Sequence, residues 1–305
     1  MPKQVLVIGG SYFAGRVFSI LCSREGDMEL HLVNRGNAPV NQSGVHEYRC
    51  ERHDVETMKT VLPDIEFDAV IDFCAYNPGD IAPVVGALGD RIGQYVFVST
   101  ASVYVNDDQA VHKEGDPILL ESDDDEVTRY ICGKSLLERE LVEACELHGV
   151  PYTILRPAFI YGPFNYAPRE SWFIKKIAHG EPVERLVDGT AHFSFVYVVD
   201  IARACRMVVG DERAFGETFN LAAPEIVTNE SFLAELEKCH GAPLDTVDVT
   251  VKQVLERNIA IPWPLDVDEL YDGTKFAETF GFSYTPFEEG MPKTYKAFMG
   301  VYAPR

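Results

Sequence analysis

The sequence predicts an α/β fold built on a doubly wound parallel sheet, with a smaller interleaved C-terminal lobe. Residues 5–8 form a continuous apolar run, as expected for a strand buried on both faces. A glycine-rich turn and a helical pattern follow this run directly. Short β-rich runs then alternate with helix-length stretches, and such alternation predicts parallel strands joined by right-handed crossovers.

The elements of this sheet are expected in the following order. Strands are predicted at residues 5–8, 29–33, 45–48, 69–73, 95–99, 152–155 and 218–221, and helices at 15–23, 128–148 and 199–209. After Tyr161, prolines and glycines break the pattern into loops and short helices. We therefore expect one domain from residues 1–163 plus about 190–222, and a lobe from 164–189 plus 223–305.

Composition and charge restrict the class of protein. The chain has 305 residues, of which 46% are hydrophobic, and a formal net charge of −21. Such a charge repels nucleic acid and anionic membrane surfaces, so neither is an expected partner. The seven cysteines are dispersed, without a C-x-x-C pair or metal spacing. We therefore expect no metal site and reduced thiols in a cytoplasmic protein.

The glycine-rich turn predicts a dinucleotide site. It joins a buried strand to a helix, where glycines allow close backbone approach and the free N–H groups of the helix attract a diphosphate. Tyr12 occupies the place of the usual middle glycine and must swing aside or cover the phosphates. The expected cofactor-binding residues of the turn are Gly9, Ser11, Tyr12, Phe13, Ala14 and Gly15.

The end of the second strand bears on the choice of cofactor. NAD sites usually carry Asp or Glu here for the ribose hydroxyls, whereas this chain has Asn34 and Arg35. Arg35 could pair with a 2′-phosphate, which favours NADP over NAD. The alternative is that Arg35 is a solvated loop residue.

Tyr130 and Lys134 are the candidate catalytic pair. Their i, i+4 spacing places both side chains on one helix face. A nearby ammonium and a cationic nicotinamide would lower the tyrosine pKa toward neutrality, so that the phenol could exchange a proton with a carbinol. Chance can supply this spacing, as it does at Tyr271 and Lys275, but only Tyr130 follows a crossover from a parallel strand. Hydroxyls at the end of the preceding strand, Ser99 and Thr100, could hold the reacting oxygen.

Ordered motifs over nearly the whole chain resemble one family. They comprise the turn at 9–15, Asp54, residues 99–104, the Tyr130–Lys134 pair, and residues 155–163, 195–202 and 272–275. The chain resembles the extended short-chain dehydrogenase/reductases of the NAD-dependent epimerase/dehydratase family. The resemblance implies a Rossmann domain with a substrate-binding lobe. The turn at residues 9–15 also resembles that of a subgroup related to chloroplast stem-loop-binding proteins.

The resemblance assigns roles to individual residues. It implies that Thr100 binds the reacting oxygen, Tyr130 is the acid/base and Lys134 binds the nicotinamide ribose. Asp54 is expected near the adenine, and Pro157 and Phe159 near the nicotinamide. Cys74 and Ser99 complete the expected cofactor site, and the expected substrate-binding residues are Thr100, Ser102, Phe159 and Phe193.

The chain also departs from the family's nucleotide-sugar pattern. Phe159 stands where an Asn is usual, Phe193 stands where a diphosphate-binding Arg is common, and a second Arg position falls near Pro262. These departures weigh against a UDP- or dTDP-sugar substrate, because a buried diphosphate needs cations. Charge could come instead from Arg169, Lys175, Lys176 and Arg185. Ala101 and Ser102, where dehydratases often have Asp-Glu, argue against dehydration.

Together these features predict an enzyme. The expected activity is that of an NAD(P)-dependent oxidoreductase or epimerase acting on a sugar or sugar-like carbinol, with a homodimer as the expected assembly. Two alternatives remain open: a nucleotide-sugar 4-epimerase proper, and a non-catalytic dinucleotide- or RNA-binding protein of the same fold.

Overall fold

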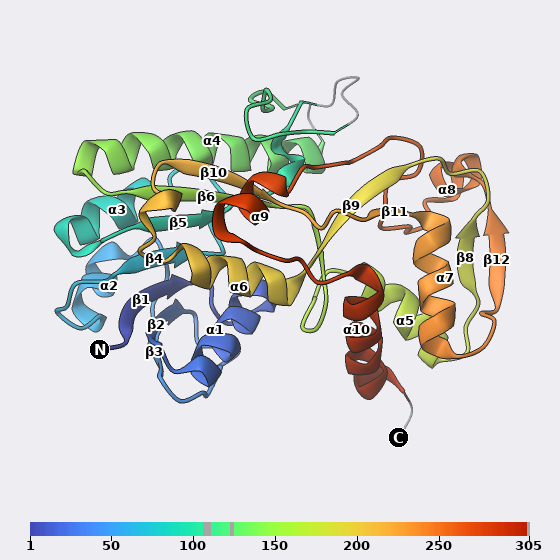
Figure 1. Cartoon of the computed structure of the whole chain (residues 1–305), viewed down its shortest axis with the longest axis horizontal. Coiled ribbons are helices and arrows are strands. Elements are labelled where there is room, and N and C mark those ends of the chain that lie inside the picture. Colours follow the sequence, from blue (N-terminus) through green and yellow to red (C-terminus); the bar gives the residue numbers. More distant parts are fainter. Residues whose placement is uncertain (106–110, 123–124, 304–305) are drawn as a thin grey trace.

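The computed structural model describes residues 1–105, 111–122 and 125–303. Its larger part is a seven-stranded sheet in the order β10-β6-β5-β4-β1-β2-β3, in which every neighbouring pair is parallel (Figure 1). The strands are β1 Lys3–Ile8, β2 Met28–Asn34, β3 Val45–Arg49, β4 Ala69–Asp72, β5 Tyr95–Val98, β6 Tyr152–Pro157 and β10 Glu217–Leu221. The predicted parallel Rossmann-like sheet is therefore confirmed.

Helices cover both faces of this sheet because its central strands are apolar on both faces. Along β1, Val5 and Val7 pack on the side of α1 (Phe13–Glu25) and α6 (Val198–Val208). Leu6 and Ile8 point to the opposite side. That side is covered by α2 Val55–Val61, α3 Ala82–Leu88 and α4 Glu126–His148. In Figure 1, α4 runs along the top above β10 and β6, and α1 lies at the lower side beside β2 and β3.

Helix α4 begins two residues before its predicted start at 128. The carboxylate of Asp125 accepts hydrogen bonds from the backbone N–H groups of Val127 and Thr128 and so caps the helix. Gly149 ends it in the left-handed region, with a φ of 67°. Both ends of the helix that carries Tyr130 and Lys134 are thus determined by local sequence.

The smaller lobe contains two short sheets with the orders β11-β9-β7 and β12-β8. Their strands are β7 Phe159–Tyr161, β8 Val183–Leu186, β9 His192–Tyr197, β11 Ile226–Thr228 and β12 Thr246–Val249. Its helices are α5 Glu170–Ala178, α7 Asn229–His240, α8 Val251–Arg257 and α10 Phe287–Tyr302. Outside this lobe, the remaining helix in the described part of the chain is α9 Thr274–Phe280. The single-turn helices η1 Gly89–Arg91, η2 Ala101–Val103 and η3 Glu212–Ala214 lie in connecting segments.

The predicted domain boundaries remain a proposal. The packing of α9 and of β9 differs from these boundaries. Helix α9 packs against β10, where Phe276 meets Phe219, and so lies with the large sheet. Strand β9 pairs with β7 and β11 rather than with the large sheet. The two parts of the fold are therefore more interleaved than the predicted boundaries suggest.

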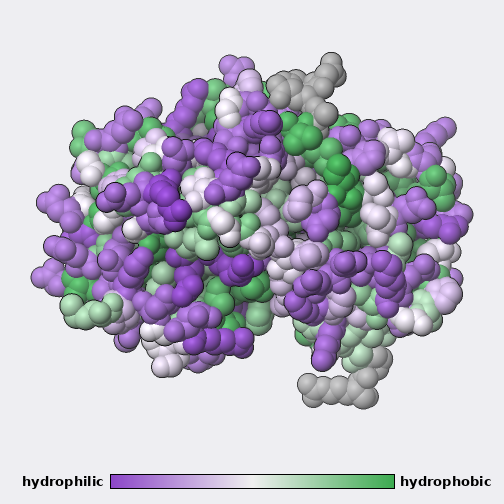
Figure 2. All heavy atoms as spheres, in the orientation of Figure 1, coloured by the Kyte–Doolittle hydropathy of each residue, from purple (hydrophilic) through white to green (hydrophobic). Residues whose placement is uncertain are grey.

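Hydrophilic residues cover most of the molecular face in Figure 2, and hydrophobic residues appear there in small groups. No helix among the described residues is long and apolar enough to cross a membrane. The same part of the chain holds no group of three or more His, Cys, Asp or Glu residues that could bind a metal ion.

Candidate dinucleotide site

A cavity of about 750 Å³ lies at the carboxyl ends of β1, β2, β4 and β5. Ligands of parallel α/β sheets bind at this edge. Most residues predicted from the sequence line the cavity together: Gly9, Ser11, Tyr12, Phe13, Ala14, Gly15, Asn34, Arg35, Cys74, Ser99, Tyr130 and Lys134. The cavity is also lined by residues 50–53, by residues that follow β4, and by Ile160 with the loop between β7 and α5.

The glycines of the turn let the backbone pass close to its neighbours. A Cβ at position 15 would lie 2.4 Å from the carbonyl oxygen of Gly9. Gly9 has a φ of +87°, and a Cβ there would lie 2.8 Å from the Cβ of Cys74. No side chain caps the start of α1. The first N–H groups of this helix are therefore available to an anion at the cavity.

Two serine hydroxyls support the fit of a dinucleotide. Ser11 Oγ and Ser99 Oγ are buried and have no hydrogen-bond partner in the part of the chain that the structure describes. Both residues line the cavity. A buried hydroxyl without a partner is energetically unfavourable, and a polar ligand would supply the missing bonds. The residues present therefore fit a nicotinamide dinucleotide.

Lys134 is held almost completely inside the protein. Its Nζ donates hydrogen bonds to the carbonyl oxygens of Ala75 at 2.8 Å and Val98 at 3.1 Å. It also lies over the rings of Tyr76 and Phe97. Burial lowers the pKa of Lys134 to about 8, although Asp72 opposes this shift. Two backbone carbonyls thus orient the ammonium at the cavity wall.

The expected lowering of the Tyr130 pKa is not present in the protein alone. Burial of the phenol raises the pKa of Tyr130 above its ordinary value, and the guanidinium of Arg169, rather than Lys134, opposes this rise. The prediction overlooked this desolvation and the cation contributed by a distant loop. A pKa of Tyr130 below its ordinary value would therefore require a bound cationic ligand.

Thr100 and Ser102 lie beside the cavity without lining it. The hydroxyl oxygen of Thr100 accepts a hydrogen bond from the backbone N–H of Ser102 at 3.2 Å and caps η2. Ser99, one residue earlier, lines the cavity instead. The role of Thr100 in holding the reacting oxygen therefore remains a proposal.

The structure corrects the assignment of Phe193 to the substrate site. Phe193 is 0% exposed and stacks on Trp263 within an aromatic core of the smaller lobe. Phe159 packs edge-on against both rings, and Pro157 is buried in β6. None of the three lines the cavity, where Ile160 takes their place. Phe159 and Phe193 therefore belong to the hydrophobic packing of the smaller lobe.

Asp54, the predicted adenine contact, caps a helix beside the cavity. Its carboxylate accepts hydrogen bonds from the N–H and the hydroxyl of Thr57 and caps α2. Asp54 does not line the cavity, whereas Glu51, Arg52 and His53 do. Because a carboxylate can accept further hydrogen bonds beside those of the helix cap, the role of Asp54 near the adenine remains a prediction.

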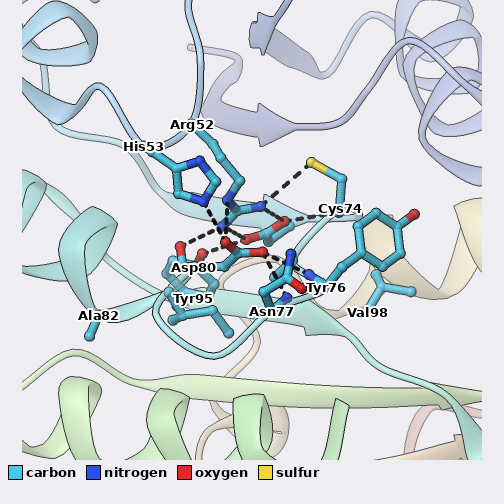
Figure 3. Close-up of polar contacts among 12 residues, drawn as sticks. Arg52, His53, Cys74, Tyr76, Asn77, Asp80, Ala82, Tyr95 and Val98 are labelled. Carbon is cyan, nitrogen blue, oxygen red and sulfur yellow. Dashed lines mark hydrogen bonds and ion pairs between the residues drawn. The ribbon is translucent and has the colours of Figure 1, made fainter. Parts of the chain in front are cut away.

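The sequence analysis missed a polar cluster at this end of the cavity, shown in Figure 3. Arg52 donates two hydrogen bonds to the carboxylate of Asp72, at 3.1 and 2.8 Å, and a third to the carbonyl oxygen of Asp80. His53 Nε2 lies 2.7 Å from Asp80 Oδ1. Asp80 also accepts from the backbone N–H of Tyr76. Asp72, the polar residue that ends the apolar strand β4, could have indicated a polar cluster here. Its partner Arg52 lies 20 positions away, so the sequence alone did not identify the pair.

The surroundings of Arg35 do not strengthen the preference for NADP. Among the described residues Arg35 makes no ion pair or side-chain hydrogen bond and is exposed. The neighbouring Asn34 donates to Glu47 Oε2 at 3.1 Å, which places a carboxylate beside the end of β2. A 2′-phosphate near this carboxylate would be repelled.

Of the four cations considered for a substrate anion, only Arg169 lines the cavity. Lys176 pairs with Glu184 and Arg185 pairs with Asp248, and Lys175 is exposed on α5. The Arg169 guanidinium lies over the ring of Phe159 at 5.4 Å from its centroid. Arg169 is therefore the loop cation available at the end of the cavity that holds Tyr130.

Glu170, beside Arg169, anchors the loop between β7 and α5. Its carboxylate is fully buried and accepts a hydrogen bond from Gly162 N at 2.9 Å. Asn165 Nδ2 donates to both carboxylate oxygens, at 3.1 and 2.9 Å. Burial raises the pKa of Glu170 to about 7, against the effect of these hydrogen bonds. The loop is thus held by a carboxyl group that titrates near neutrality.

This raised pKa predicts a pH-dependent stability. The folded state keeps the proton of Glu170 to a higher pH than the unfolded chain, so stability is lost as pH rises from 4.5 to about 7. The loss attributable to Glu170 is up to about 3 kcal/mol. Urea unfolding of the wild type and of Glu170→Gln at pH 5 and pH 8 should show a smaller decrease for the variant.

The matched control for this experiment is Glu56→Gln, because Glu56 has an exposed side chain on α2. Its unfolding free energy should follow the wild type over the same pH interval. If the unfolding free energies of the wild type and of Glu170→Gln changed equally with pH, Glu170 would not be the source of the pH dependence.

Comparison with known proteins agrees with this geometry. Residues 83–222 match the NAD dependent epimerase/dehydratase family. A chloroplast stem-loop binding protein of 41 kDa from Arabidopsis thaliana is 29% identical over 255 residues, which cover 79% of this chain and 64% of that protein. The chain thus spans less than two thirds of this relative's length.

Solved structures share the fold over nearly the whole chain. The UDP-glucose 4-epimerase of Thermotoga maritima is similar with a TM-score of 0.80 and 20% identity, covering 98% of this chain and 99% of that one. A dTDP-glucose 4,6-dehydratase from Bacillus anthracis, solved with NAD, also has a TM-score of 0.80, with 18% identity and 98% and 97% coverage. From these matches, residues 83–222 belong to the NAD-dependent epimerase/dehydratase family, and nearly the whole chain shares the fold of solved epimerases and dehydratases.

Proposed function

We propose that this protein is an NAD(P)-dependent enzyme that oxidises or reduces a carbinol of a sugar or sugar-like substrate, as an epimerase or a reductase. The observation that carries the proposal is the joint placement of Tyr130, Lys134 and two unpartnered serine hydroxyls on one cavity wall. A bound nicotinamide supplies the hydride acceptor and donor. A 4-epimerase acting on a nucleotide sugar is the narrower form of this proposal.

The chain's own residues handle the proton and orient the groups. Tyr130 takes the proton from the carbinol during oxidation and returns it during reduction. Lys134, fixed by the carbonyls of Ala75 and Val98, directs its remaining N–H toward the ligand. Thr100 is the proposed donor to the reacting oxygen, and Arg169 offers a cation to the substrate.

We propose NAD as the cofactor, since Glu47 lies beside the end of β2 and a structural relative holds NAD. Native mass spectrometry of the purified protein should reveal a dinucleotide, and NADH should bind more tightly than NADPH. Addition of UDP-glucose, dTDP-glucose or their uronate forms to the NAD-loaded protein should produce absorbance at 340 nm with the correct substrate class. Failure to bind either dinucleotide would contradict the proposal.

RNA binding is the second candidate, because a relative is named as a stem-loop binding protein. The net charge of −21 opposes it, since RNA binding requires a basic surface. Filter binding with a stem-loop RNA at low salt separates the two functions. If the protein is an enzyme, the filter should retain no RNA at any salt concentration. Retention of RNA that decreases as salt rises would favour RNA binding.

The proposed assembly is a homodimer and the proposed location is the cytoplasm. Leu147 is 81% exposed on α4, the helix through which we propose the subunits to pack. All seven cysteines are unpaired, which suits a reducing compartment. Sedimentation velocity tests the assembly.

A further inference from the structure

The loop between β7 and α5, residues 163–169, reaches from the smaller lobe to the glycine turn. Asn165, Tyr166 and Ala167 line the same cavity as Tyr12 and Phe13. At its base, Glu170 binds Gly162 and Asn165, and the Asn165 side chain accepts from the N–H of Ala167. The base of the loop is therefore held firmly, which determines where the Tyr166 side chain is placed.

The tip of this loop contacts the turn through aromatic rings. The ring of Tyr166 meets Tyr12 edge-on at 6.4 Å between centroids and Phe13 at 6.3 Å, with interplanar angles of 81° in both pairs. In the same loop, Phe164 lies under the guanidinium of Arg16 from α1, at 5.5 Å. Edge-to-face pairs of this kind are attractive.

Tyr166 also connects the turn to the other end of the cavity. Burial raises the pKa of Tyr76 and the nearby phenol of Tyr166 adds to this rise, and the Tyr76 ring lies 6.5 Å from that of Tyr130. Lys134 lies over the same Tyr76 ring. A single side chain from the smaller lobe thus joins the diphosphate-binding turn to the aromatic residues around the catalytic pair.

We propose that residues 163–169 are a strap that closes the dinucleotide groove, and that Tyr166 is the residue that fastens it. This inference rests on the proposed function. It also accounts for Tyr12, which replaces the middle glycine of the turn: its ring is half exposed and turned toward the strap. Because the strap contacts join protein residues to each other, they must break both when the dinucleotide enters and when it leaves.

The strap predicts a kinetic effect that a simple ligand contact would not produce. In Tyr166→Ala, both association and release of NADH should become about tenfold faster, as expected for the loss of two ring pairs of ordinary strength. The dissociation constant should change less than either rate. Tyr166→Phe keeps the ring pairs and loses only the hydroxyl beside Tyr76, so its rates should lie between those of the wild type and Tyr166→Ala.

Stopped-flow fluorescence measures both rates, with NADH binding for association and a chase with excess NAD for release. Leu255→Ala is the matched control, since Leu255 is 70% exposed on α8 and distant from the cavity lining. A double-mutant cycle of Tyr12→Ala and Tyr166→Ala should show non-additive release rates, because the two rings contact each other.

The outcomes separate this inference from the function on which it rests. Wild-type protein that binds no NADH would overturn both. Binding with unchanged rates in Tyr166→Ala would overturn the strap alone. Faster release with unchanged association would also overturn it, because Tyr166 would then be a direct ligand contact.

Discussion

Replacement of Tyr130 by phenylalanine should reduce turnover of the sugar substrate by about 10²–10⁴-fold, the usual contribution of a positioned acid/base. Phenylalanine keeps the ring and its contact with Tyr76 but cannot exchange a proton with the carbinol. Binding of NADH should be nearly unchanged. The measurement is the single-turnover rate of cofactor reduction at 340 nm after the NAD-loaded protein is mixed with saturating substrate, together with the NADH dissociation constant.

Tyr295→Phe is the control for this experiment. Tyr295 is buried in α10, bonds His240 and does not line the cavity, so its removal tests the general cost of losing a tyrosine hydroxyl. Its turnover should stay close to wild type. Undiminished turnover in Tyr130→Phe would exclude Tyr130 as the acid/base.

Arg156→Met should destabilise the protein by about 3–5 kcal/mol, because it leaves the carboxylate of Glu138 buried without its partner. The Arg156 guanidinium donates to both oxygens of Glu138, at 3.0 and 2.6 Å, and the two side chains are only 6% and 4% exposed. It also donates to the Tyr104 hydroxyl at 2.9 Å. Urea unfolding at neutral pH measures the loss.

An exposed ion pair on the same molecule provides the comparison. Arg185 and Asp248 are each more than half exposed, so Arg185→Met should change the unfolding free energy by no more than about 1 kcal/mol. The double variant Arg156→Met, Glu138→Leu removes both charges and should recover most of the loss. Equal effects of Arg156→Met and Arg185→Met would contradict the assigned burial penalty.

This buried pair connects stability to the site. Glu138 lies one helical turn beyond Lys134 on α4, and Arg156 lies on β6. Their ion pair attaches the helix that carries Tyr130 and Lys134 to the sheet that carries Ser99. Arg156→Met should therefore impair cofactor binding as well as stability.

The sequence predicted the parts of the protein that depend on local patterns. Apolar runs and crossovers predicted the parallel sheet, because strands buried on both faces must be apolar throughout. Strand context selected Tyr130 and Lys134 over Tyr271 and Lys275. In the structure the second pair separates, with Tyr271 bonded to Glu269 and Lys275 to Glu217.

Residues whose role depends on distant partners could not be placed in this way. Phe193 stacks on Trp263, 70 positions away in sequence, and no motif predicts this contact. The partners of Arg52 are 20 and 28 positions away in sequence.

By itself, then, the sequence determined the sheet, the glycine turn and the helix with Tyr130 and Lys134, because hydrophobic period and turn chemistry act between near neighbours. Tertiary structure alone decided which polar groups face the cavity and that Tyr166 reaches Tyr12. Such contacts join residues 154 positions apart, and their energies depend on packing that local sequence does not encode.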